Sequence, residues 1–350
     1  MRGRGFALAL SVLLFGAAIR AAESYPTFTD ATKAGPDFQV QGEFVGLLGG
    51  ERPVAAQVIA LGGGHFEGIV YRGGLPGAGW DGSVRSYIRG ETKDGRTRFT
   101  GIFGERLKFH NPNFQGVIED GIFGGSDQSF RNVSQDVSFE LEKVDRRSPT
   151  LGATAPTGAI VLFDGPDTSE WTDGELVEGN LLKWGTTTKR EFKSVRLHLE
   201  FRCPFMPTAR GMHRGNSGVY VKNEWEIQIV DSFGWTTENR KFERLSHFAR
   251  AGGIHEMVQP RLNMSFPPLS WQTYDVEFTA ARFDNSGKKA APAMMSLWHN
   301  GVSIHDKYIL PPVPPGRNLS ESTEGFPGRL YLQDHGNPVA FRNVWVVEKN

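Results

Sequence analysis

The stretch RGNSGVYVKNEWEIQIVDSFG, residues 214–234, indicates the fold more clearly than any other part of the chain. From Trp225 to Ile229, apolar residues alternate with two polar ones, Glu226 and Gln228. Successive side chains of a β-strand point to opposite faces of its sheet, so the apolar set faces a core. The stretch therefore predicts a strand that displays a carboxylate and an amide on its other face.

Short polar residues stand at both ends of this strand. Asn216, Ser217 and Gly218 supply a residue tolerant of the left-handed conformation, a hydroxyl and a glycine, which is typical of a turn leading into a strand. Asp231 follows the strand at its far end, where a carboxylate either caps the strand or belongs to a site. Both interpretations of Asp231 stay open on these residues alone.

Two further segments, RLHLEFR at 196–202 and RLYLQDHG at 329–336, repeat the alternation of apolar and polar residues. Their polar residues are His198, Glu200, Arg202, Tyr331, Gln333 and His335. Either these are solvated outer faces, or the three strands line the concave sheet of a β-sandwich. Such a sheet is where sandwich folds usually bind sugars.

The rest of the chain predicts an all-β protein. Apolar residues seldom recur with a helical period, whereas short alternating or aromatic-rich runs separated by Gly, Pro, Asn and Asp recur throughout. A length of 350 residues favours two domains. We expect a smaller β-rich domain over residues 23–145, a linker over 146–158 that contains Pro149 and Pro156, and a second β-domain over 159–350.

The N-terminal domain has the pattern of a meander or a barrel-like array of strands. Four of its segments share an aromatic-x-Gly-hydrophobic pattern, and they begin at Phe44, Phe66, Phe99 and Phe114. Their irregular spacing favours hairpins over a repeat array. In the glycine-rich stretch that follows the third strand, Trp80 either faces a sugar ring or packs beneath a turn.

Residues 1–22 have the pattern of a secretory signal peptide. They combine Arg2 with an apolar run from Phe6 to Ile19. No later segment is continuously apolar for about 18 residues, so we expect no membrane span after signal cleavage. The pattern predicts export to the periplasm or the extracellular space. Arg20 weakens the cleavage site and leaves an uncleaved anchor as the alternative.

Charge and cysteine content exclude some classes of partner and metal site. The 39 basic and 39 acidic residues cancel, so no overall field attracts nucleic acid, and we expect no nucleic-acid partner. Cys203 is the only cysteine in the chain, which excludes an internal disulfide and a metal site built on cysteines. Its strand-like surroundings predict a small buried apolar residue.

Several motifs of the second domain occur in a fixed order. They are LFDGPDTSEW, TTTKREF, LHLEFR, RGNSGVYV, WEIQIVDSFG, WQTYDVEF, WHNG and LQDHGNPVAFRNVWV. In this order the chain resembles the 3-keto-disaccharide hydrolase family over residues 160–347. The resemblance implies a concanavalin A-like jelly-roll β-sandwich for this domain. It also implies a carbohydrate partner, an oxidised disaccharide or glycoside.

The substrate of that family implies a chemistry. A ketone at C3 of a glycosyl ring acidifies the C2 hydrogen, so a carboxylate can remove that proton, the C1 aglycone can leave, and water can then add. This needs a base, an electrophile or divalent cation at the enolate oxygen, and an acid for the leaving group. We therefore expect Glu226 as base or metal ligand, Asp231 beside it as a catalytic residue or ligand, and His335 as acid or further ligand. The cofactor is left open, with a divalent metal ion as one option.

The expected substrate-binding residues are Asn216, Gln228, Gln333, His198, Glu200, Arg202 and His255. His255 departs from the family pattern, since many members carry Gly-Ala-Ile-Tyr where this chain has Gly-Gly-Ile-His at 252–255. The imidazole either replaces the tyrosine as proton donor or marks an altered activity. His305, beside Asp306, is expected on the surface. The alternative to an enzyme is a carbohydrate-binding or envelope interaction module, because a lectin and a lyase can share one concave face.

Overall fold

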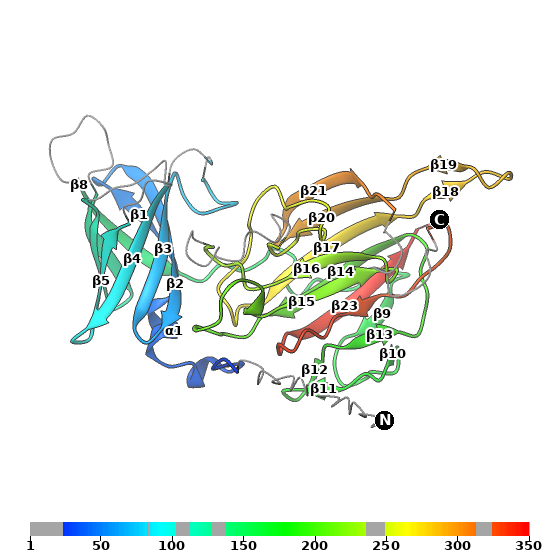
Figure 1. Ribbon diagram of the computed structural model, residues 1–350, viewed down its shortest axis with the longest axis horizontal. Coiled ribbons are helices and arrows are strands. Elements are labelled where there is room, and N and C mark those ends of the chain that lie inside the picture. The colour runs from blue at the N-terminus through cyan, green and yellow to red at the C-terminus, as the bar shows by residue number, and fades with distance from the viewer. Residues whose placement is uncertain are drawn as a thin grey trace, which may run out of the picture.

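The computed structural model describes residues 24–80, 82, 85–102, 113–127, 137–235, 249–312 and 324–349. The predicted signal peptide at 1–22 lies outside these residues. The chain is nearly all β, with a barrel followed by a two-sheet sandwich (Figure 1). Within the described residues, no helix is both long and apolar enough to cross a membrane.

The N-terminal domain is a closed antiparallel barrel in which each strand pairs with the next and β8 returns to β1. Two short helices precede it, η1 (Ala31–Lys33) and α1 (Pro36–Val40). The barrel strands are β1 (Gly42–Leu48), β2 (Arg52–Gly62), β3 (His65–Arg72), β4 (Arg85–Lys93), β5 (Arg96–Gly101), β6 (Gln115–Glu119), β7 (Ile122–Asp127) and β8 (Val137–Val144). The prediction of a meander or barrel-like domain is confirmed as a barrel.

The aromatic-x-glycine pattern has a packing reason. Residues two apart share a face, so each aromatic residue points into the barrel together with a glycine. At Gly116, a Cβ would stand 2.5 Å from the ring of Phe123 and 3.3 Å from that of Phe114. Phe123 also packs against the rings of Phe99 and Phe139, with centroids 5.0 and 5.3 Å away. Gly116 therefore makes room for the phenylalanine rings that fill the core.

The C-terminal domain is a sandwich of two sheets. One has five strands, ordered β10-β13-β22-β15-β16, and the other has eight, seven of them ordered β11-β12-β23-β14-β17-β20-β21 and the eighth, β9, paired with β23. The strands of the first sheet are β10 (Trp171–Thr172), β13 (Thr186–Thr188), β15 (Ser217–Val221), β16 (Trp225–Ile229) and β22 (Tyr331–Leu332). Those of the second are β9 (Ile160–Phe163), β11 (Leu176–Val177), β12 (Leu181–Leu182), β14 (Val195–Arg202), β17 (Gln272–Thr279), β20 (Met294–His299), β21 (Val302–Ile309) and β23 (Ala340–Glu348). A separate hairpin pairs β18 (Arg282–Phe283) with β19 (Lys289–Ala291), and η2 (Gly211–His213) precedes β15.

One apolar core joins the two sheets. Trp225 and Ile227 of β16 and Leu197 and Phe201 of β14 are all fully or almost fully buried in it. The alternation of these strands therefore works as predicted, and their polar residues face away from the core. Cys203 is buried in the same core as a free thiol. The prediction of an all-β fold with a C-terminal sandwich is confirmed.

Phe205 joins the sandwich to the barrel. It follows β14, yet its ring belongs to the barrel core and lies 5.3 Å from the ring of Phe38. Its backbone pairs with Phe28 through two hydrogen bonds of 2.8 and 3.0 Å. A second connection is the ion pair of Arg146 with Glu43, whose carboxylate is fully buried on β1. The two domains thus share packed and charged contacts.

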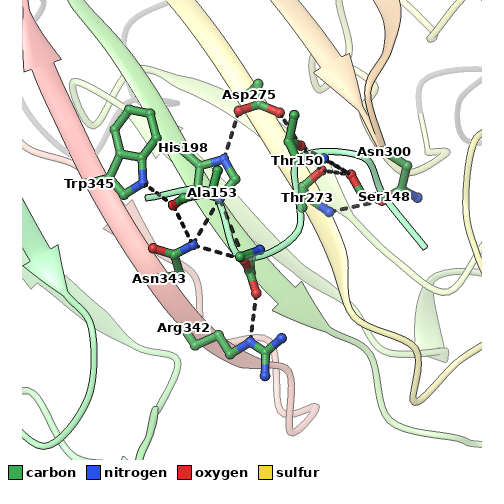
Figure 2. A network of polar contacts seen from close by, with 12 residues as sticks. Ser148, Thr150, Ala153, His198, Thr273, Asp275, Asn300, Arg342, Asn343 and Trp345 are labelled. Carbon is green, nitrogen blue, oxygen red and sulfur yellow. Dashed lines mark hydrogen bonds and ion pairs between the residues drawn. The ribbon is translucent and has the colours of Figure 1, made fainter. Parts of the chain in front are cut away.

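The segment predicted as a linker, 146–158, lies along the outer face of the eight-stranded sheet (Figure 2). We call its residues 148–153 the strap. The hydroxyl of Ser148 lies 2.6 Å from that of Thr273, and the hydroxyl of Thr150 donates to Asp275 at 2.7 Å. The carbonyl of Ala153 accepts hydrogen bonds from β23. The domain boundary stays a prediction, but the strap is hydrogen-bonded to the sheet.

Candidate functional site

The candidate site is built on the hairpin of β15 and β16. In its register, Tyr220 lies opposite Glu226 and Gly218 lies opposite Gln228. All four residues point away from the sandwich core, because Val219 and Ile227 between them point into it. The outer face of the five-stranded sheet therefore carries the carboxylate and the amide that the sequence predicted.

Glu226 is the central side chain of this face. Only 7% of it is exposed, and the hydroxyl of Tyr220 donates a 2.8 Å hydrogen bond to its Oε2. Burial raises the pKa of the Glu226 carboxyl above its ordinary value, although the nearby His255, the hydrogen bond from Tyr220 and His335 each lower it. A carboxylate with a raised pKa and fixed orientation is suited to act as a general base.

His255 reaches the carboxylate from a segment that lies along the free edge of β16. Residues 252–255 hydrogen-bond to this strand, with the N–H of His255 donating to the carbonyl of Glu226 at 2.9 Å. The imidazole Nδ1 then lies 3.2 Å from Oε1 of Gln228 and 3.7 Å from Oε2 of Glu226. The residue that departs from the family pattern is therefore next to the expected base.

Gln228 and Gln333 complete the polar floor of the site. The Gln228 amide donates to Oδ1 of Asn216 at 2.9 Å, which fixes its Oε1 toward His255. Gln333, just past β22, donates to the hydroxyl of Tyr220 at 3.2 Å. Its Oε1 accepts no hydrogen bond from the described residues. Gln333 therefore has a free acceptor beside the Tyr220–Glu226 pair.

A cavity of about 510 Å³ opens over these side chains. It is lined by Met212, Asn216, Tyr220, Glu224, Glu226, Gln228, His255, Glu256, Met257, Pro311, Pro312, Gln333 and His335. His335 is exposed, and it contributes from the opposite side of the hairpin to His255. The cavity thus combines three carboxylates and two imidazoles with a wall of methionine and proline, a size and composition that suit a small glycoside.

Asp231 lies outside this group. It is 2% exposed, and its Oδ2 binds the guanidinium of Arg214 at 2.8 and 2.9 Å. Burial raises the pKa of Asp231, opposed by the charge and hydrogen bonds of Arg214. Arg214 also donates to the carbonyl of Ala60 in β2 at 3.3 Å. The geometry gives Asp231 a role at the domain junction, and it does not line the cavity with Glu226.

The polar face of β14 is also elsewhere, which corrects the expectation that three strands line one concave sheet. Strand β14 belongs to the eight-stranded sheet, whereas β16 and β22 belong to the other. His198 lies on the outer face of its sheet under the strap (Figure 2). Glu200 is buried two residues further along β14 and accepts the N–H of Gly152 in the strap. Arg202 pairs with Glu178 and stacks on Trp271. A single strand cannot reveal which of two sheets it joins.

The expectation that His305 lies on the surface is corrected. His305 is buried, and its Nε2 lies 2.8 Å from the carbonyl of Gly252, so it supports the segment that carries His255. The described residues contain no group of three or more His, Cys, Asp or Glu placed to hold a metal ion. Glu226 and Asp231, the two candidate ligands, have separate partners.

Tyr220 and Glu224 line the cavity but were not predicted as site residues. A turn at Lys222 and Asn223, both with positive φ, sets the register of the hairpin. Placing that turn would have paired Tyr220 with Glu226. Glu224, two residues before Glu226, shares its face and lines the same cavity. The positions of Met257, Pro311 and Pro312 could not be predicted from strand alternation, because loops bring these residues to the cavity.

The fold and this cavity define a jelly-roll protein that carries a recessed group of carboxylate and imidazole side chains on the outer face of one sheet. Residues 158–347 match the family described as the 3-keto-alpha-glucoside-1,2-lyase-like domain, so the chain belongs to that family. The resemblance found in the sequence is thereby confirmed.

Comparisons with solved structures found proteins from Parabacteroides distasonis ATCC 8503, each provisionally named a glycosyl hydrolase. One is 26% identical to this chain with a TM-score of 0.46, and the match covers 56% of this chain and 86% of the other protein. Another is 18% identical with a TM-score of 0.41, covering 55% and 94%. No curated protein matches the chain.

Proposed function

We propose that this chain cleaves 3-keto-glycosides by elimination across C1 and C2, followed by hydration. The observation that carries the proposal is the buried Glu226 carboxylate, fixed by Tyr220 and flanked by His255 at the floor of a cavity. Membership of a family named for a 1,2-lyase supports the same reaction class. Export to the periplasm or the extracellular space is part of the proposal and rests on the N-terminal sequence.

In the first step, Glu226 takes the proton from C2, and the electron pair of that C–H bond moves into the C3 ketone to form an enolate. His255, beside the carboxylate, is the proposed donor to the enolate oxygen. The C1–O bond then breaks, C1 and C2 become doubly bonded, and His335 gives the leaving oxygen a proton. Water adds its hydroxyl to C1 and its hydrogen to C2, which releases the 3-keto sugar.

The other residues of the cavity bind and orient in this proposal. Gln333, which lines the cavity, is the proposed partner of a sugar hydroxyl, and the Asn216–Gln228 pair keeps the His255 ring in position. Met257 and Pro311 offer an apolar wall to the aglycone. Three glutamates, Glu224, Glu226 and Glu256, disfavour a negatively charged ring in the cavity.

The test follows deuterium. Purified protein is incubated with a 3-keto-disaccharide in deuterated water, and label at C2 of the product is measured. We expect label with the wild type and a loss of on the order of a hundredfold in turnover with Glu226→Gln. Glu175→Gln, an exposed carboxylate paired with Lys183, is the matched control and should turn over normally.

Three results would contradict the proposal. Turnover of Glu226→Gln at the wild-type rate would remove Glu226 from the mechanism. Product formed by the wild type without label at C2 would replace elimination by direct displacement at C1. Sugar binding without turnover across a panel of 3-keto-glycosides would favour the non-catalytic binding module.

A further inference from the structure

A second cavity, of about 730 Å³, lies where the barrel, the segment after β8 and the sandwich meet. Its walls come from α1, the start of β1, residues 143–147, the loop at 267–271 and β23. It shares no lining residue with the candidate site. We call it the junction cleft.

The junction cleft carries a net positive charge. Four cationic side chains line it, against the single acid Asp145, and they are Lys143, Arg146, Arg147 and Arg342. Arg146 and Arg342 are paired with the buried carboxylates of Glu43 and Glu200. Two cations without a carboxylate partner are therefore left, and with Asp145 counted the cleft has one net positive charge.

These two charges are on Lys143 and Arg147. Within the described residues, Arg147 is exposed and forms no ion pair. Lys143 donates to the backbone carbonyl of Gln39 and forms no ion pair there either. Burial also lowers the pKa of Lys143, with Asp145 opposing the shift, although part of this side chain is exposed. An anion beside the ammonium would favour its charged form.

A neutral donor in the wall also lacks an acceptor. Gln41 is 2% exposed, and its Oε1 accepts the N–H of Ala60 at 3.2 Å, which fixes the orientation of the amide. Its Nε2 then has no hydrogen-bond partner among the described residues. Buried donors without a partner are uncommon in folded proteins, and this one is shielded from solvent.

The far wall is rigid. The guanidinium of Arg342 lies 3.9 Å from the ring centroid of Trp271, and that of Arg202 lies 5.2 Å from it. Arg342 is also bonded to Glu200 at 2.7 Å (Figure 2). Ser270 adds a hydroxyl to the same wall. Cations, an aromatic ring and small neutral donors thus face one space, as a sugar that carries acidic groups would require.

We propose that the junction cleft binds an acidic saccharide through its carboxylate or sulfate groups, held by Arg147 and Lys143. The volume suits a short oligosaccharide. The candidate site, with its three glutamates, is unsuited to such a group. The proposal does not depend on the proposed reaction.

Calorimetric titration of the full chain tests the proposal with three probes. Trigalacturonate carries carboxylates on a sugar, maltotriose is a neutral sugar of equal length, and sodium sulfate is a bare oxyanion. We expect trigalacturonate to bind, more weakly at higher salt, and maltotriose not to bind. Arg147→Gln and Lys143→Gln should each raise its Kd by about tenfold. Arg282→Gln, an exposed arginine on β18, is the control and should leave the Kd unchanged.

Thermal unfolding of each variant confirms that it is folded. The proposal is overturned if trigalacturonate produces no heat, if Arg147→Gln and Lys143→Gln bind it like the wild type, or if maltotriose binds equally well. Sulfate binding as tightly as trigalacturonate would overturn the saccharide assignment. Glu226→Gln should bind trigalacturonate normally, which separates this cleft from the proposed reaction.

Discussion

The carboxylate of Glu226 lies directly over Gly218, and a Cβ at Gly218 would stand 2.4 Å from its Oε1. The two residues belong to neighbouring strands, and Gly218 faces Gln228 in the register. Since the φ of Gly218 lies outside the range that requires glycine, the space above it explains the residue. Glycine here allows a buried carboxylate to lie flat against the sheet.

Gly218→Ala therefore tests the position of the carboxylate. The added methyl would push the flexible end of Glu226 away from Tyr220, so we expect turnover to fall by at least tenfold with a small change in thermal stability. Gly165→Ala, where a Cβ meets no atom within 4 Å, is the control. Normal turnover by Gly218→Ala would show that the observed carboxylate position is not required.

The pH dependence of turnover tests the protonation of Glu226. The base must be ionised, and burial raises its pKa. We therefore expect kcat/KM to fall on the acid side at a pH above the pKa of an ordinary glutamate, about 4.3. Tyr220→Phe removes a hydrogen bond that lowers this pKa, so the fall should move to higher pH. If kcat/KM falls at the same pH in Tyr220→Phe as in the wild type, the hydrogen bond from Tyr220 does not control the pKa of Glu226.

Glu226→Gln should also affect stability. A group whose pKa is raised in the folded state stabilises below its unfolded pKa, and that contribution is lost as pH rises through the folded pKa. At pH 7 the buried charge thus opposes folding, and Glu226→Gln should unfold at the same temperature as the wild type or higher. A clear fall in melting temperature at pH 7 would show that the charge is stabilising.

His305 is a positioning residue in our interpretation, since it contacts Gly252 and not the cavity. His305→Leu should release the segment that places His255 and lower kcat by about tenfold, whereas His305→Gln keeps a donor and should recover part of it. Combined with His255→Ala, His305→Leu should add little further loss. Full additivity in this double-mutant cycle would mean that the two residues act separately.

Glu200 should control acid stability of the strap. Burial opposes ionisation, but hydrogen bonds from His198, Asn343, the N–H of Gly152 and Arg342 lower the pKa of Glu200 to about 2. A lowered pKa stabilises above the unfolded value and loses that effect as pH falls toward 2. Glu200→Gln should cost on the order of 2 kcal/mol at pH 7 and flatten the loss below pH 4. Chemical denaturation across pH measures both.

Exposed Glu142→Gln is the control for this experiment, and its acid unfolding should match the wild type. An equal dependence on pH in Glu200→Gln and the wild type would assign the acid sensitivity to another carboxyl.

Phe205→Ala should uncouple the two domains. The ring is fully buried in the barrel core although it belongs to the sandwich chain segment, so its loss should cost about 3 to 5 kcal/mol. Phe283→Ala, on an exposed ring, should cost far less. We expect two unfolding transitions in calorimetry of Phe205→Ala where the wild type shows one. Unchanged unfolding would mean that the shared ring does not couple the domains.

The sequence by itself determined the elements and their faces. Alternation at residues 225–229 and 196–202 fixed which side chains enter the core, and glycine after an aromatic residue marked the barrel strands. These are local rules, since a strand has a period of two wherever it lies. The order of the motifs along the chain was sufficient to indicate the family.

The tertiary structure alone decided which polar faces meet. Glu226 and His198 have the same alternating pattern, yet one lines the cavity and the other lies under the strap, because their strands join different sheets. The partners of Asp231 and His305, Arg214 and the carbonyl of Gly252, depend on contacts between distant residues and on the barrel packed beside the sandwich. Local periodicity specifies the direction of a side chain but carries no information about what the rest of the chain places opposite it.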